Sequence, residues 1–245
     1  MELRDRLLGL MDRKDHPSWH RLASGQLRPA QLLLHYQQEW LVYVRDFPVL
    51  LARVLGKSPP TEVRRMLAEN LYEEQTGGLS LGRSHAEMFL EMMEAVGFSR
   101  AAFTSVAPLA EAEAYRAWLD HVTLERGWLQ AAAVVTIFVE GSVNDRGETA
   151  AAGLKAPPPA VDIERMVHEH PLVRHYGADA ARLTLIRAHR QVEGGHRRDA
   201  WSMVLGHVAT HADADAVVRA VETSLALWLL YRESVTRAMD AAPSS

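Results

Sequence analysis

The sequence contains no cysteine among its 245 residues. This absence excludes disulfides, thiolate metal ligands and a cysteine nucleophile. Any metal would have to be held by histidine, aspartate and glutamate side chains, which suit iron, manganese or zinc better than copper(I) or an iron–sulfur cluster. Such side chains are plentiful, because the chain has 12 histidines and 31 acidic residues.

The sequence also lacks a strong charge bias and a long apolar run. Its formal net charge is −4, and no block of like charge stands out, which argues against nucleic acid or an anionic membrane surface as the main partner. No stretch of about 18 apolar residues and no signal-peptide pattern is present. We therefore expect a cytoplasmic protein without a membrane partner.

A third absence is that of β-strand patterns. Almost every segment has apolar residues spaced three and four apart, which is typical of amphipathic helices. The one β-branched run, residues 133–139, has no turn signal before it and is interpreted as buried helix. We predict an all-α bundle of about seven helices in one domain, residues 1–245. An irregular insertion is expected at about 145–160 and a frayed tail at 241–245.

Several residues predict where helices begin or bend. Pro48 should bend or break a long helix over about 28–56. Thr61 follows two prolines and is predicted to cap the next helix. Ser84 and Glu87 form a capping-box pattern at the start of another helix.

The sequence HRQVEGGH places His189, Glu193 and His196 within roughly 60° of one another on a predicted helix, so that they can converge on one point. A solvated polar face is the alternative interpretation of this triple. Gly194 and Gly195 favour the ligand interpretation, because each costs about 1 kcal/mol relative to alanine inside a helix. Something must offset that cost, such as close approach of another helix or of a substrate.

Carboxylates in unfavourable places mark further candidates. Glu140 ends an apolar run that looks buried on all sides, where a carboxylate is costly unless it is paired or bound to a cation. The alternative is a helix end that reaches solvent, since Gly141 follows. Glu73 and Glu74 close one predicted helix against its dipole, and His85 opens the next after a glycine-rich loop. Ordinary surface charge would also explain these three residues.

Several short motifs resemble those of a known superfamily. The segment ENLYEEQTGG…RSHAEMF resembles the NL-x-x-E…H-x-x-L-[WF] element of the haem-oxygenase-like helical superfamily that includes pyrroloquinoline quinone synthase C. The order Glu, His, Glu and then His-x-x-x-acid-x-x-His resembles the ligand pattern of its di-iron oxidases and oxygenases. HPSWHRLASGQL, RDFPVLLARV and HYG resemble further segments of the family. The resemblance extends from about His16 to Trp201.

The resemblance implies a pair of iron ions that activates O₂ beside a small organic substrate, with an external reductant where the reaction needs one. Known members fragment fatty acids or amino acids, N-oxygenate amines, or make para-aminobenzoate from one of their own tyrosines. Manganese is the alternative metal. Carried over by position, the implied ligands of the two ions are Glu74, His85, Glu140, His189, Glu193 and His196.

The sequence departs from the family pattern at three places. Glu193 replaces the usual aspartate, so its carboxylate reaches further and the second metal position is weakened or shifted. Trp19 stands where the self-sacrificing para-aminobenzoate synthases need a tyrosine, which disfavours that activity. The segment after Glu140 is longer than in those synthases, and we expect it to form a lid or a wall of the substrate pocket.

Other branches of the superfamily fit the residues less well. Thiaminase-like enzymes generally use a cysteine nucleophile, which this chain lacks. Pyrroloquinoline quinone synthase C is cofactor-free and binds a very acidic substrate, for which three carboxylates at ligand positions are unsuitable. A true haem oxygenase needs an axial histidine near the N-terminus. His16 or His20 could serve, but the ligand pattern would then be unexplained.

The sequence therefore predicts a non-haem di-iron oxidase or oxygenase that acts on an amino-acid-, amine- or fatty-acid-like substrate, in biosynthesis. Two rivals remain: an inactive helical interaction protein on the same fold, and a cofactor-independent oxidase or hydrolase. Asp199, Arg190 and Tyr72 are candidates for hydrogen bonds to the metal-binding histidines. The apolar stretch 224–231 fits either the core or the surface of a homodimer.

Overall fold

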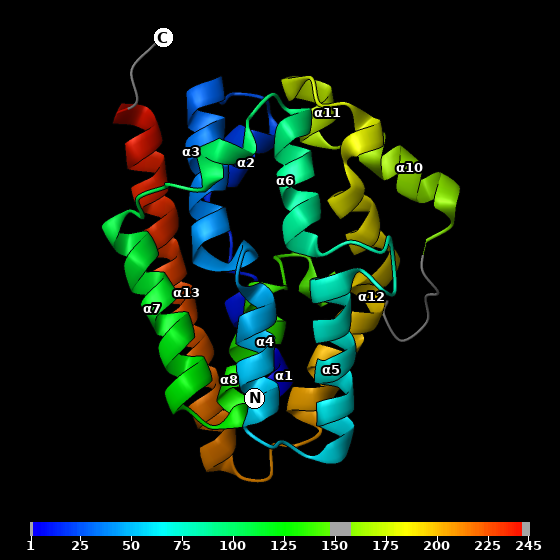
Figure 1. Cartoon of the computed structure of the whole chain (residues 1–245). Coiled ribbons are helices and arrows are strands. Elements are labelled where there is room, and N and C mark those ends of the chain that lie inside the picture. Colours follow the sequence, from blue (N-terminus) through cyan, green and yellow to red (C-terminus); the bar gives the residue numbers. More distant parts are fainter. Residues whose placement is uncertain (1, 148–157, 242–245) are drawn as a thin grey trace.

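The computed structural model describes residues 2–147 and 158–241, apart from the side chains of residues 193 and 194. The secondary structure of this part is helical, without strands, as predicted (Figure 1). The elements, in chain order, are α1 (Leu3–Met11), α2 (Pro17–Ala23), α3 (Pro29–Glu39), π-helical η1 (Trp40–Val44), α4 (Phe47–Gly56), α5 (Thr61–Thr76), α6 (His85–Ala95), 3₁₀-helical η2 (Arg100–Phe103), α7 (Ala110–Glu125), α8 (Trp128–Ala132), π-helical η3 (Ala133–Val139), α10 (Ala160–His168), α11 (Pro171–Tyr176), 3₁₀-helical η4 (Ala180–Arg182), α12 (Thr184–Leu205) and α13 (His211–Ala241).

The described part holds twelve α-helices rather than about seven. One reason is that the helix predicted over 28–56 is divided into α3, η1 and α4, with Pro48 in the first turn of α4. A second reason is that two short helices, α2 and α11, each begin with a proline, whose fixed φ angle suits the first helical position. Periodicity over six or seven residues is too short to reveal such helices.

Two other local expectations had different outcomes. Ser84 accepts a hydrogen bond from the Glu87 N–H at 3.2 Å, so the predicted cap of α6 is confirmed. The predicted Thr61 cap is wrong, because Pro60 occupies the cap position and Thr61 is the first helical residue of α5. A proline at the cap fixes the entry of the chain without a side-chain hydrogen bond.

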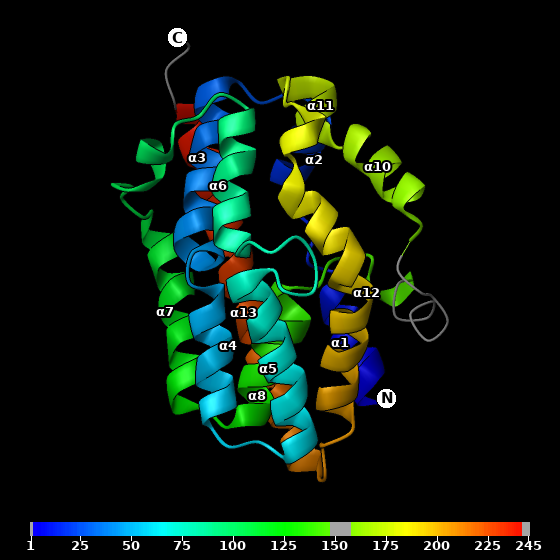
Figure 2. The ribbon, with the colours of Figure 1, turned by 45° about the vertical axis from the view of Figure 1, so that its right-hand side comes forward.

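The long helix α13 packs directly against α7 (Figures 1 and 2). Leu225, Trp228 and Tyr231 of the stretch 224–231 are buried, so this face of α13 belongs to the core, whereas Leu230 is 56% exposed. No helix in the described ranges is long and apolar enough to cross a membrane.

The helices that matter for the site meet in the middle of the molecule. Helices α5 and α6 follow one another along its long axis, and α12 packs against both of them and against η3 (Figures 1 and 2). Of the predicted insertion at 145–160, residues 145–147 are helical, residues 148–157 lie outside the described residues, and α10 begins at Ala160. A lid or wall formed by this segment therefore stays a prediction. The predicted frayed tail falls mostly outside the described residues, because α13 ends at Ala241.

Candidate metal centre

Helix α5 carries polar side chains on the face that packs into the protein. Val63, Leu67, Asn70 and Glu74 are spaced four, three and four residues apart and therefore share one side of the helix. Val63 and Leu67 are fully buried, and the stripe continues with Asn70 at 6% and Glu74 at 9% exposure. An apolar stripe that becomes polar but stays buried places hydrogen-bonding groups inside the protein, where they need partners.

The turn between α5 and α6 brings His85 back to the end of α5. Helix α5 ends at Thr76, and the capping residue Gly77 has a left-handed φ of 62°. A side chain there would collide with the backbone of Arg83, so only glycine allows this close return of the chain. Ser84 then caps α6, and His85 is its first residue. The histidine is 5% exposed.

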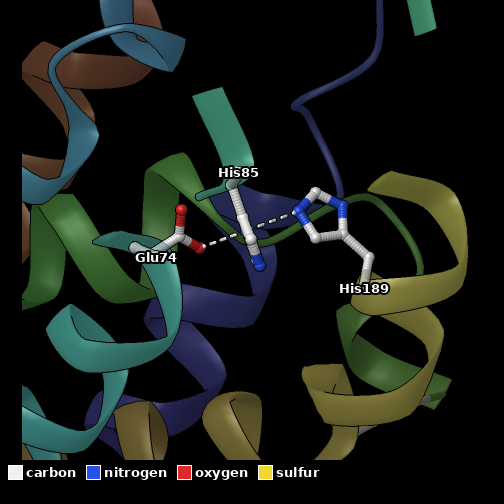
Figure 3. A group of neighbouring side chains, drawn as sticks. All are labelled: Glu74, His85 and His189. Carbon is white, nitrogen blue, oxygen red and sulfur yellow. Dashed lines mark hydrogen bonds and ion pairs between the residues drawn. The ribbon is translucent and has the colours of Figure 1, made fainter. Parts of the chain in front are cut away.

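Three side chains from three helices converge on one point. Glu74 of α5, His85 of α6 and His189 of α12 each offer a ligand atom, and these atoms lie within 4.8 Å of one another. His85 Nδ1 is 2.9 Å from Glu74 Oε1 and 3.2 Å from His189 Nε2. Figure 3 shows the His85 ring between the other two side chains. Two histidines and one carboxylate are the donor set typical of non-haem iron(II) sites.

The other nitrogen of His85 faces the neighbouring carboxylate of α5. Glu73 is fully buried, and its Oε1 lies 3.1 Å from His85 Nε2. It also accepts hydrogen bonds from Ser80 Oγ and, at 2.7 Å, from the Leu79 N–H. Burial favours the neutral form of Glu73, but these hydrogen bonds outweigh it and lower the pKa of its carboxyl group. These hydrogen bonds hold the Glu73 carboxylate in place beside His85 Nε2. The other ring nitrogen, Nδ1, therefore points at Glu74.

The charge of His85 follows from these two carboxylates. Burial lowers the pKa of His85, but the hydrogen bonds and charges of Glu74 and Glu73 outweigh burial and raise it above its ordinary value. The two carboxylates therefore favour the protonated form of His85, whose charge would balance theirs. A metal ion bound by Nδ1 would take over this role at the same point, while Nε2 keeps its hydrogen bond to Glu73.

The three side chains lie on the wall of a cavity of about 210 Å³. Most of its other wall residues are apolar, so the polar group occupies one side of a largely apolar cavity. Pockets for drug-sized ligands measure about 300–1,000 Å³, so this cavity suits a smaller molecule. The residues that line it are Tyr43, Val44, Phe47, Glu74, His85, Val139, Glu140, Leu185, His189, Val192 and His196.

Both π-helical segments reach this cavity. Segment η1 contributes Tyr43 and Val44, and η3 ends at Val139, directly before Glu140. A π-helical turn contains an extra residue and changes the direction of the side chains that follow, and such turns are frequent at functional sites. The apolar run 133–139 is buried helix, as predicted, although of this wider form, and its wider turns aim Val139 and Glu140 at the cavity.

Glu140 is held by Asn70, and its surroundings raise the pKa of its carboxyl group. The Asn70 amide donates a hydrogen bond of 2.8 Å to Glu140 Oε1. Burial, together with the negative charge of Glu74, raises the pKa of Glu140 to about 8. Glu140 is half-buried and lines the cavity, which disfavours the alternative of a helix end in open solvent. A cation bound beside this carboxyl group would stabilise its ionised form.

His196 contributes a nitrogen without a partner. Its Nε2 is buried and makes no hydrogen bond, and burial lowers the pKa of the ring. A neutral imidazole nitrogen in this position is available as a metal ligand. Gly195 has open space where a side chain would begin, so close approach of another helix does not explain this glycine. That part of the prediction is wrong for Gly195.

The six predicted ligands thus fall into three groups. Glu74, His85 and His189 meet within 4.8 Å of one another. Glu140 and His196 line the same cavity but lie outside this tight group. The side chain of Glu193 lies outside the described residues, although its backbone belongs to α12.

One histidine partner was not among the three candidates from the sequence, and one of those candidates is wrong. Glu73 is the hydrogen-bond partner of His85 Nε2. The sequence offered one indication of this role: Glu73 is adjacent to Glu74, and both acids are buried at the end of α5. Tyr72 is 52% exposed and its ring lies against Gly78, so this candidate is wrong. Asp199 lines a small cavity together with His196, which keeps it near that histidine.

Sequence comparison decides the family. Residues 34–229, which include all six predicted ligands, match the family described as "Iron-containing redox enzyme". The chain belongs to the iron-containing redox enzymes. Curated proteins gave no significant match to the sequence. The family name agrees with the histidine and carboxylate donor set at the centre of the molecule.

Solved structures show which fold this iron-containing redox enzyme has. A TenA homologue from Pseudomonas syringae pv. tomato str. DC3000 superposes with a TM-score of 0.69 at 16% identity, over 96% of this chain and 91% of that chain. A domain of unknown function with a haem-oxygenase-like fold from Shewanella denitrificans OS217 gives 0.67 at 19% identity, over 99% and 95%. At such identities the likeness concerns the fold alone. The predicted haem-oxygenase-like fold is confirmed.

Proposed function

We propose that this protein is a non-haem di-iron oxidase or oxygenase that uses O₂ to oxidise a small organic substrate. The observation that carries the proposal is the convergence of Glu74, His85 and His189 within 4.8 Å, at a cavity that Glu140 and His196 also line. The membership in the iron-containing redox enzymes supports iron over manganese as the metal.

The two proposed metal positions draw on different residues. Glu74, His85 and His189 would hold the first ion. Glu140 and His196, together with Glu193, would hold the second. The surroundings of Glu140 disfavour its ionised form, which a cation would stabilise, and the buried Nε2 of His196 has no hydrogen-bond partner. When bound, the iron ions would supply the electrons and the Lewis acidity that reduce and activate O₂. An external reductant would return them to the iron(II) state.

The protein itself orients these ligands and shields the reaction. With a metal bound, Glu73 would hold the proton of His85 on Nε2 and leave Nδ1 to the metal. Asn70 fixes one oxygen of Glu140. Val44, Phe47 and other apolar wall residues keep bulk water from the reacting centre.

The cavity also limits the substrate. A volume of about 210 Å³ between apolar walls fits a short amino-acid-, amine- or fatty-acid-like molecule. The haem alternative receives no support from the two N-terminal histidines. His16 caps α2 and faces Glu233 at 3.3 Å, and His20 is an exposed residue paired with Asp15.

The decisive experiment counts metal ions and follows O₂. The protein is prepared without metal, loaded anaerobically with iron(II), and the bound iron is measured before O₂ consumption is recorded. We expect two irons per chain and rapid O₂ uptake. His189→Ala and Glu140→Ala should each lose iron and O₂ uptake. His20→Ala, which removes an exposed histidine remote from the cavity walls, should behave as wild type.

Two outcomes would replace the proposal. If neither iron binding nor O₂ reactivity is found, the ligand set is a relic and the protein is an interaction module. If a turnover assay shows full activity after chelation of all metal, the protein is a cofactor-independent oxidase or a hydrolase on the same scaffold.

A further inference from the structure

The ammonium group of Lys14 is bound to the backbone on both sides of Glu140. Lys14 lies in the connection between α1 and α2, far from η3 in the sequence. Its Nζ donates hydrogen bonds to the carbonyl oxygens of Phe138 at 2.6 Å, Val139 at 3.2 Å and Gly141 at 2.6 Å. An ammonium group has three donors, and here each has a carbonyl partner.

The carbonyls of Phe138 and Val139 belong to the last turn of η3, and the carbonyl of Gly141 follows directly after the helix. The last C=O groups of a helix have no partner within it, and a cation near them is favourable. Lys14 also lies over the ring of Phe138, with Nζ 4.8 Å from the ring centre. The lysine therefore holds the final turn of η3 both through its carbonyls and through a side chain of the same turn.

A second contact fixes the backbone immediately after Glu140. A side chain at Gly141 would collide with the Ile137 carbonyl, the Asp145 carboxylate and the Met11 methyl group. The chain can therefore leave η3 along this path only because residue 141 is a glycine. Lys14 on one side and this tight packing on the other leave Glu140 little freedom to turn away from the cavity.

Capping a helix does not by itself require such a lysine. Lys57 also donates to a helix-terminal carbonyl, that of Leu124 at 2.9 Å, but it does so at the surface of the protein. Lys14 is half-buried, and each of the three donors of its ammonium group has a carbonyl partner around one helix end. Three such hydrogen bonds from a distant segment are more than helix capping needs, which points to a role beyond it.

We propose that Lys14 is a positioning residue for the second metal site, which holds the backbone of Glu140 so that its carboxylate faces the metal. Asn70 fixes the side chain of Glu140, and Lys14 fixes the peptide units around it. This inference rests on the proposed role of Glu140 as a ligand. It assigns no contact between Lys14 and metal, O₂ or substrate.

The test is a cobalt(II) titration of metal-free protein, followed by visible absorption and by equilibrium dialysis. Wild type should bind two ions. In Lys14→Met the first ion should bind with unchanged affinity, whereas the second should bind about 10- to 100-fold more weakly, as for other losses of support around a ligand. Lys14→Arg, which keeps a cation with several donors, should recover part of this affinity. Lys57→Met is the matched control and should bind both ions as wild type does.

The outcomes separate this inference from the proposed function. Equal affinity of wild type and Lys14→Met for the second ion would overturn the positioning role and leave the two-metal site standing. Equal weakening of both ions would also overturn it, because that indicates general damage to the fold. Fewer than two ions in wild type would overturn the proposed site itself. If Lys14→Met loses its helical circular dichroism, Lys14→Arg decides by the same comparison of the two affinities.

Discussion

Nε2 of His85 lies 3.1 Å from Oε1 of Glu73. Each ring nitrogen of His85 therefore faces a carboxylate: Nδ1 faces Glu74, and Nε2 faces Glu73. A carboxylate behind a histidine fixes the tautomer and the ring direction and makes the free nitrogen a better ligand. The proposed first metal position would thus depend on a residue that does not itself touch the ion.

Replacement of Glu73 by glutamine should weaken the first metal site. The amide keeps the size of the side chain but removes the charge, and we expect metal affinity to fall by about 10- to 100-fold. Isothermal titration of metal-free protein measures this. Glu62→Gln is the matched control, because Glu62 is likewise 3.0 Å from a histidine nitrogen, that of His207, at the surface. Equal affinities of the two variants would show that Glu73 has no role in metal binding.

The raised pKa of Glu140 predicts how the metal-free protein responds to pH. In the unfolded chain this carboxyl group ionises near 4.5, but in the folded protein its pKa is about 8. Between these values the folded state binds more protons than the unfolded state. The contribution of Glu140 to stability therefore falls as pH rises from about 4.5 to about 8, by at most about 1.4 kcal/mol per pH unit.

Thermal unfolding of metal-free protein at a series of pH values tests this expectation. The melting temperature of wild type should fall over this range more steeply than that of Glu140→Gln, which has no proton to lose. Parallel curves for the two proteins would mean that Glu140 is ionised in the folded state. Iron should reverse the trend, because its binding requires the ionised carboxylate and becomes tighter as pH rises.

The positions of these ligands were predictable to different degrees. Glu74, His85 and His189 could be placed on separate helices, because helical periodicity and caps are local properties of the sequence. Their meeting point could be expected only through the family resemblance. The contact of Lys14 with residues 138–141 joins segments far apart in the chain, and no local pattern encodes it.

The π-helical segments show the same limit. Residues 133–139 could be identified as buried helix from their composition, but the wider turn that directs Val139 and Glu140 depends on packing against other helices. The same holds for η1 and Tyr43, whose hydroxyl group donates to the buried Glu39. Tyr43 was missed for this reason.

A buried ion pair behind the cavity makes a prediction about stability. Arg232 is fully buried and binds Glu39, which also accepts a hydrogen bond of 3.0 Å from Tyr231. Removal of the guanidinium leaves a buried carboxylate without its counter-charge. Arg232→Met should therefore lower the free energy of unfolding by about 3–5 kcal/mol, as measured by urea denaturation.

The control for this variant is a surface ion pair that also involves α13. Arg21 binds Asp240 of α13 at 2.8 Å, and Asp240 is more than half exposed. Arg21→Met should change the free energy of unfolding by about 1 kcal/mol or less. If Arg232→Met also lowers the free energy of unfolding by only about 1 kcal/mol or less, Glu39 finds other donors or becomes protonated in that variant.

Two glycines beside the proposed ligands should respond in opposite directions to alanine. A methyl group at Gly195 meets open space within α12, so Gly195→Ala should raise the free energy of unfolding by about 1 kcal/mol through better helix propensity. The same methyl group at Gly141 would collide with backbone and side-chain atoms, so Gly141→Ala should destabilise the protein. Urea denaturation of the two metal-free variants measures both effects. Because Gly195 precedes His196 without crowding it, Gly195→Ala should also keep full metal binding, whereas loss of metal there would show that bound metal or substrate occupies the open space.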